Sequence, residues 1–182
     1  MAKHVGEPAE EKSEEKKQLR FLLNQFLMLL LKLAVFAVMA IILFGYVFGL
    51  TRSSGLGMEP AFRDGDLILY YRITGTCSAD EVLVVRYHGE KLLERVVAVA
   101  GDEVDITEHG LMINGAPVQE TDVRGETTRF EEGVSFPLRV PEGKVFVLGD
   151  NREHATDSRI FGCVDTDDVY GRVIGLFRRR NL

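Results

Sequence analysis

Three short segments of the chain combine glycine turns with side chains that could take part in catalysis. They are residues 54–66, 91–102 and 149–162. Ser54 offers a hydroxyl nucleophile, Lys91 an amine base, and Glu94 a carboxylate, which can also act as a base when it is buried. The four histidines are scattered without ligand spacing, so we expect no metal site and no cofactor.

A long apolar run precedes these segments. No charged residue occurs from Leu33 to Leu50, and at ~1.5 Å per residue this run spans about 27 Å, close to the ~30 Å hydrocarbon core of a membrane. No Ala-x-Ala cleavage signal follows it, which favours an uncleaved anchor over a signal peptide. We therefore predict a transmembrane helix over residues 26–50.

The charges on either side of this helix indicate its orientation. Five Lys and Arg precede Phe21, whereas Arg52 stands alone just after the helix, and positive residues favour the cytoplasmic side. We expect residues 1–25 to form a polar cytoplasmic tail, in which residues 1–20 are either disordered or a frayed helical segment. Residues 51–182 then form an extracytoplasmic domain in a single-pass protein of the cell membrane.

The charge balance restricts the partners of this domain. Residues 1–32 hold six of the 22 Lys and Arg and five of the 28 Asp and Glu, which leaves 16 basic and 23 acidic residues beyond them. An acidic domain argues against nucleic acid as a partner. Membrane lipid is a partner through the anchor; Arg178–Arg180 either contact anionic headgroups or form a solvated tail, the alternative we favour.

The outer domain has the pattern of short strands. Its apolar and β-branched runs are residues 66–71, 81–87, 95–100, 111–113, 145–148 and 172–177. Asn114-Gly115 predicts a tight hairpin, because this pair accepts the positive φ angles that such a turn needs. We predict a mainly β fold, an antiparallel β domain behind one N-terminal transmembrane helix, with residues 103–140 as a possible small subdomain or insertion.

The two cysteines leave two alternatives open. Cys77 and Cys163 lie in predicted loops or strand edges, where they could form one disulfide if they meet in space. Two separate thiols are the other interpretation, and the one we favour.

The three segments together resemble the characteristic boxes of the type I signal peptidase family, whose members cleave with a Ser/Lys dyad. Met58-Glu59-Pro60 resembles the first box, and residues 95–102 the second. Residues 149–152, 157–159 and 161–162 resemble the third. The resemblance covers most of the outer domain and implies a signal-peptidase-like β fold.

The residues on which that chemistry depends are replaced. By the resemblance, the nucleophile position is Gly57, the general-base position is Glu94, and the position of the serine that orients the base is Ala155. Ser54 and Lys91 each lie three residues before a vacant position, an odd shift that turns a strand residue to the opposite face. We therefore expect no intact catalytic site, with displaced rescue by these two residues as the alternative.

The resemblance also implies what the other residues of the boxes do. Met58, Pro60, Val82 and Val84 would bind substrate, the two valines on a strand beside which a peptide lies extended. We assign a structural role to Gly149, Asp150, Asn151, Arg152, Asp157, Ser158 and Arg159, which would form a hydrogen-bonded turn that holds the β core.

The function implied is binding without cleavage. Dyad-lacking relatives of the family assist the assembly of surface pili, so the resemblance implies a chaperone-like or assembly role toward exported preproteins or pilin-like proteins. An active signal peptidase and an unrelated membrane-tethered β binding module are the alternatives.

Overall fold

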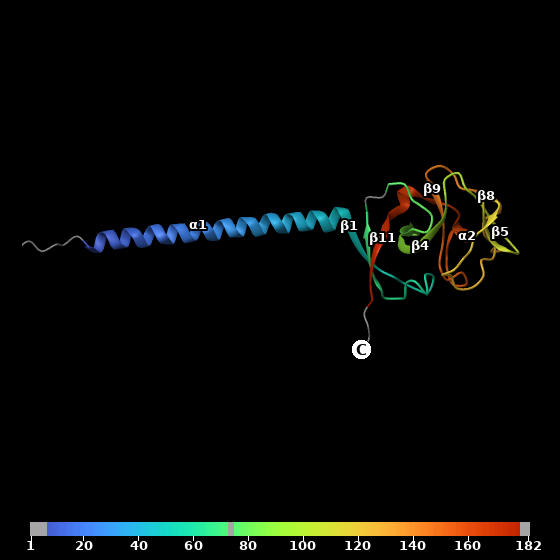
Figure 1. Ribbon diagram of the computed structural model, residues 1–182, viewed down its shortest axis with the longest axis horizontal. Helices are drawn as coiled ribbons and strands as arrows, with labels where there is room; N and C mark the ends of the chain where they lie inside the picture. The colour runs from blue at the N-terminus through green and yellow to red at the C-terminus, as the bar shows by residue number, and fades with distance from the viewer. Residues whose placement is uncertain (1–6, 73–74, 179–182) are drawn as a thin grey trace, which may run out of the picture. The chain divides into compact units, whose positions relative to one another are not determined.

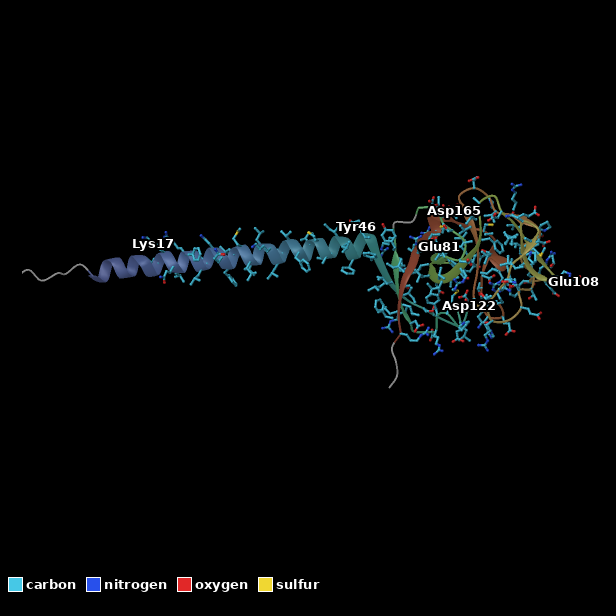
Figure 2. The ribbon with its side chains drawn as sticks, viewed as in Figure 1. Lys17, Tyr46, Glu81, Glu108, Asp122 and Asp165 are labelled. Atoms are coloured by element: carbon cyan, nitrogen blue, oxygen red, sulfur yellow. The ribbon has the colours of Figure 1, made fainter. Side chains whose placement is uncertain are left out.

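The computed structural model describes residues 7–72 and 75–178, with side chains from Lys16 onward. It divides into two compact units, Met1–Gly45 and Tyr46–Leu182. The first unit is the helix α1, Glu7–Ile42, which continues as a π-helical turn, Leu43–Val47. Its apolar side chains are exposed on all sides (Figure 2). The stretch Lys16–Val47 is long and apolar enough to cross a membrane.

The boundaries of the helix differ from the sequence expectation at both ends. The helix already begins at Glu7, before the predicted start at residue 26, so the helical alternative holds for residues 7–20; residues 1–6 lie outside the described part. At the other end residues 48–50 belong to strand β1, Phe48–Arg52, not to the helix. The reason is that the backbone of Phe48 pairs with Tyr71 of the neighbouring strand, so the apolar run ends in a sheet.

The second unit is built from two antiparallel sheets, which confirms the predicted mainly β fold. The larger has the order β1-β2-β11-β3-β4-β9-β10 and the smaller β7-β6-β5-β8. Their bounds are β2 Leu67–Tyr71, β3 Val82–Tyr87, β4 Glu90–Val99, β5 Glu103–Thr107, β6 Gly110–Ile113, β7 Ala116–Pro117, β8 Leu138–Arg139, β9 Lys144–Leu148, β10 Val164–Asp165 and β11 Val169–Phe177. A short helix α2, Ser158–Phe161, and a 3-10 turn, Thr166–Asp168, complete the unit.

The two sheets occupy opposite ends of the β domain. Figure 1 shows β1 and β11 at one end and β5 and β8 at the other. The smaller sheet lies wholly within residues 103–139, the range expected to form a subdomain or insertion. Its β6–β7 hairpin turns at Asn114 and Gly115, whose φ angles of 52° and 79° confirm the predicted tight turn.

The larger sheet is strongly curved. Lys91 on β4 donates a hydrogen bond from Nζ to the Tyr70 hydroxyl of β2 at 3.1 Å, although β11 and β3 lie between these strands. Such a contact requires the sheet to coil around its concave face. That face holds a core cluster of Met58, Phe62, Ile68, Tyr70, Val84 and Leu93.

Tyr70 fits this core only because the strand beside it carries a glycine. A Cβ atom on Gly49 would lie 2.2 Å from Cζ of Tyr70, far inside van der Waals contact. Gly49→Ala should therefore lower the free energy of unfolding by about 1–3 kcal/mol, because overpacking displaces the ring. Chemical denaturation of the detergent-solubilised chain would measure this. Gly75→Ala is the control, since a Cβ added at Gly75 would meet no atom within 4 Å, and equal losses in both variants would contradict the prediction.

Candidate functional site

The positions expected to carry the nucleophile and the base-orienting serine lie side by side. The carbonyl of Gly57 accepts a hydrogen bond from the backbone N–H of Asn151 at 2.8 Å. A Cβ atom on Gly57 would lie 3.5 Å from Cα of Ala155 and 3.7 Å from its Cβ, an ordinary contact distance. The fold thus brings these two positions together and leaves room for a small side chain at residue 57.

Gly149 permits this close approach. A Cβ atom on Gly149 would lie 2.3 Å from Cβ of Ala155 and 2.6 Å from the carbonyl oxygen of Gly57. Any side chain there would push the two segments apart. Gly149 follows directly on β9, so the end of that strand sets the position of the site.

A buried ion pair supports the turn that follows β9. Asp157 and Arg159 have fully buried side chains 2.9 Å apart. The Asp157 carboxylate also accepts the backbone N–H of Gly149, and the Ser158 hydroxyl accepts that of Val147 on β9. A buried charge is tolerated when it is paired and hydrogen-bonded, as it is here.

Two further pairs extend the network. Asp150 receives two hydrogen bonds of 2.7 Å from Arg95 in a bidentate arrangement. The buried Arg152 donates from Nε to the carbonyl of Gly149 and from Nη1 to Glu120. The residues expected to be structural are thereby drawn into one hydrogen-bonded assembly.

Sequence reasoning missed the segment that completes this assembly. The backbone of Arg124 bonds to Asp150 and Arg152, a bridge that pairs residue 124 with residue 151, while buried Thr127 accepts from Arg152 and donates to Glu120. Polar, aperiodic residues in this region give no period that could indicate such pairing. The need of a buried arginine for an acidic partner is the only signal that could have pointed to it.

The residue at the general-base position, Glu94, is buried. It lies on β4 opposite Leu83 of β3, is 4% exposed, and its Oε2 atom has no hydrogen-bond partner among the described residues. Burial raises the pKa of the Glu94 carboxyl well above its ordinary value, and the carboxylates of Asp157 and Asp150 raise it further. Glu94 is therefore a neutral acid over a range in which an ordinary glutamate is charged.

Two of the four substrate-binding residues expected from the sequence are inside the core. Met58 is 4% exposed, and Val84 is completely buried, so neither side chain can contact a peptide in this structure. Val82 and Val84 lie on β3, which pairs with β11 on one side and β4 on the other. A peptide strand cannot be added beside Val84, because β11 and β4 already pair with that residue. In the described strand pairs Val82 is paired with Arg95 of β4 and not with β11, and its side chain is partly buried, so substrate binding by Val82 stays a prediction. Pro60 is exposed.

The displaced residues do not form a dyad. Ser54 is exposed in the loop after β1, whereas the Lys91 amine bonds to the Tyr70 hydroxyl, not to a serine. Cys77 and Cys163 are both free thiols. Within the described residues no group of three His, Cys, Asp or Glu is arranged to hold a metal ion.

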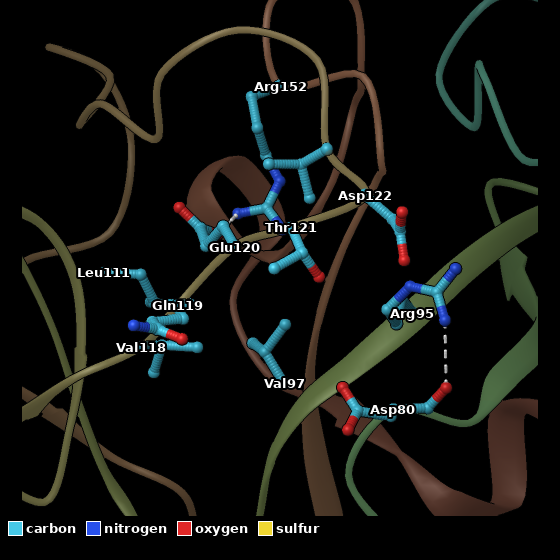
Figure 3. A pocket seen from close by; sticks show the side chains of 11 residues that line it. Asp80, Arg95, Val97, Leu111, Val118, Gln119, Glu120, Thr121, Asp122 and Arg152 are labelled. Atoms are coloured by element: carbon cyan, nitrogen blue, oxygen red, sulfur yellow. Dashed lines mark hydrogen bonds and ion pairs between the residues drawn. The ribbon is translucent and has the colours of Figure 1, made fainter.

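A cavity of about 310 Å³ lies beside the assembly, between β4 and residues 118–123 (Figure 3). Val97, Leu111 and Val118 supply apolar walls, and Arg95 and Arg152 reach it from the network. Both guanidinium groups are already committed, the first to Asp150 and the carbonyl of Asp80, the second to Glu120. The cavity is therefore lined in part by the hydrogen-bonded assembly. Neither of these two arginines is left unpaired to bind an anion in it.

The fold and the helix define a membrane-anchored, mainly antiparallel β protein with one small, braced polar site. The model of the family "signal peptidase, peptidase S26" matches residues 26–177. Signal peptidase I of Bacillus licheniformis is 29% identical over 175 residues, covering 89% of this chain and 90% of the relative. Signal peptidase IB of Staphylococcus aureus strain COL is 31% identical over 139 residues, covering 65% and 72%.

The chain therefore belongs to the signal peptidase family, peptidase S26. Among solved structures, a signal peptidase I from Enterococcus faecalis V583 matches with a TM-score of 0.46 and 26% identity, over 55% of this chain and 98% of that one. Membership implies substrates of the signal-peptide-bearing preprotein class.

The buried acid gives this site a distinctive pH dependence. Because the folded-state pKa of Glu94 is raised, its contribution to stability is full below the pKa of an unfolded glutamate and is lost as the pH rises through the folded pKa. Glu94→Gln should therefore have a free energy of unfolding about 1–3 kcal/mol higher than the wild type at pH 8. At pH 4 this advantage should be smaller, because Glu94 is then protonated. Chemical denaturation at a series of pH values measures this.

Glu90→Gln is the matched control, since Glu90 is an exposed glutamate on the same strand. It should leave the pH profile unchanged. Parallel profiles for wild type and Glu94→Gln would show that Glu94 ionises in the folded protein as it does in the unfolded chain.

Proposed function

We propose that this chain binds an extended segment of exported preproteins without cleaving it, from the extracytoplasmic side of the membrane. The observation that carries the proposal is the contact between Gly57 and Ala155. Neither residue has a hydroxyl, so the place where the family's attacking and orienting hydroxyls would stand holds no nucleophile. Glu94 at the base position is a neutral acid with no hydroxyl to deprotonate.

The peptide would bind at an open strand edge next to this place. Residues Lys91–Glu94 of β4 pair with β3 on one side only, and β9 joins the other side from Arg95 onward. None of the backbone hydrogen bonds of the described turns and loops closes this edge. An added strand would lie in line with β9, and its end would meet Gly149, Gly57 and Ala155. Strand addition needs only backbone donors and acceptors, so it does not require the dyad.

This role is a chaperone-like or assembly function for exported proteins, with pilin-like proteins as one client group. Its rival is an active signal peptidase, the activity named for the relatives. The two differ in whether a bound preprotein is cut.

Cleavage is tested with a preprotein that carries alanine one and three residues before the junction. The purified full-length chain should bind it saturably and leave it intact, because no hydroxyl stands at residue 57. The combined variant Gly57→Ser, Glu94→Lys and Ala155→Ser should gain measurable cleavage, since a Cβ at residue 57 fits without a clash. The control is the combined variant Gly57→Ala, Glu94→Lys and Ala155→Ser, which lacks the hydroxyl at residue 57. Turnover by the wild type that is lost in Ser54→Ala would overturn the proposal.

Strand addition is tested with peptides from the same junction. N-methylation of alternate backbone nitrogens should weaken binding about tenfold or more in one peptide, because it removes the hydrogen bonds that face β4. The peptide methylated at the intervening positions, whose nitrogens face away, should bind nearly normally. Equal affinity of the two peptides, measured by fluorescence anisotropy, would place binding elsewhere.

A further inference from the structure

Two cations surround one tyrosine at the point where the membrane span ends. The guanidinium of Arg72 lies 5.3 Å from the ring centre of Tyr70, and the Lys91 amine lies 5.4 Å from the same centre. Lys91 also lies 4.9 Å from the ring of Tyr170. Both cations thus lie near Tyr70 of β2, and Lys91 also lies near Tyr170 of β11.

Neither cation is paired with an acid in the described part of the chain. Within residues 16–72 and 75–178, no carboxylate forms an ion pair with Arg72 or Lys91. Nε of Arg72 donates to the carbonyl of Phe48 at 3.0 Å, and no described acceptor binds its two Nη groups. Lys91 uses one hydrogen for Tyr70 and has two left. Beyond residue 32 acids outnumber bases, so two unpaired cations around one ring are not a general property of this domain.

A backbone hydrogen bond places Arg72 beside the end of the apolar span. The apolar span ends at Val47, and the N–H of Arg72 donates to the Val47 carbonyl at 2.8 Å. Arg72 is therefore hydrogen-bonded to the last residue of the span. A side chain at that level lies among lipid headgroups, where anionic phosphates attract Lys and Arg.

We propose that Arg72 and Lys91 form a binding site for the phosphate of an anionic phospholipid headgroup. Arg72 contributes its two Nη groups, Lys91 its remaining hydrogens, and Tyr70 holds the two cations in place. Charge-assisted hydrogen bonds from an arginine and a lysine are the usual means of holding a phosphate. Lys91 also belongs to the strand edge proposed to bind peptide, but the peptide would pair with its backbone, whereas the phosphate would bind its side-chain amine.

The test uses the full-length chain in a neutral detergent and a short-chain phosphatidylglycerol, with phosphatidylcholine of the same chain length for comparison. The wild type should bind phosphatidylglycerol more tightly, as measured by native mass spectrometry. Arg72→Gln and Lys91→Gln should each weaken it about fivefold, and the double variant roughly 30-fold, with phosphatidylcholine binding unchanged. Inorganic phosphate should not compete at equal concentration.

The controls separate a specific site from charge and from misfolding. Arg139→Gln removes the same charge from β8 in the other sheet and should bind as the wild type does. Lys91→Arg keeps the charge and should retain binding, which shows that a loss in Lys91→Gln is not a folding defect. Equal binding of the double variant and the wild type would overturn the proposal. So would equal weakening in Arg139→Gln, or displacement of the lipid by inorganic phosphate.

Discussion

The buried carboxylate of Asp157 organises the polar end of the β domain. It is paired with Arg159 and accepts the N–H of Gly149 in the turn after β9. Moving this carboxylate would leave the buried Arg159 unpaired, which is costly, so the turn is held in place. Gly149 in turn sets the distance between Gly57 and Ala155. The geometry of the site is thus set by Asp157, Arg159 and Gly149, and the side chains at residues 57 and 155 do not determine it.

Burial is the main reason why the pKa of Glu94 is raised, and the same buried acids add to it. The carboxylates of Asp157 and Asp150 act on residue 94 and disfavour a second negative charge there. The guanidinium groups of Arg159 and Arg152 act in the opposite direction and offset part of this effect on the pKa of Glu94.

Sequence reasoning predicts the elements whose signals are local. The Asn114-Gly115 turn and the apolar runs of β3 and β9 are recognisable directly, because turn chemistry and β-branched residues act within a few positions. Strand β1 is missed, because Phe48 to Leu50 continue an apolar run and only their pairing with β2 distinguishes strand from helix. Whether a strand lies at an edge or in the interior is also non-local. This is why the sequence suggests that Val84 faces a peptide, when β11 and β4 in fact enclose it.

Side-chain partners are the least predictable part of the site. The sequence favours a solvated tail for Arg178, yet its guanidinium bonds to Asp66 and to the carbonyl of Ala61, more than a hundred residues earlier. Arg179 and Arg180 lie outside the described residues. Lys91, which the sequence offers as a candidate base, reaches the Tyr70 hydroxyl only because the sheet is curved. Such contacts depend on the completed fold, and no short-range pattern carries them.

The position of β11 determines when this domain can fold. Residues 169–177 are inserted between β2 and β3, and Arg178 bonds to Asp66 of the first turn. A nascent chain that has delivered β1 to β10 still exposes two unpaired strand borders, which are sites of aggregation until they are filled. Folding of the larger sheet must therefore wait until residues 169–177 are available to pair with β2 and β3.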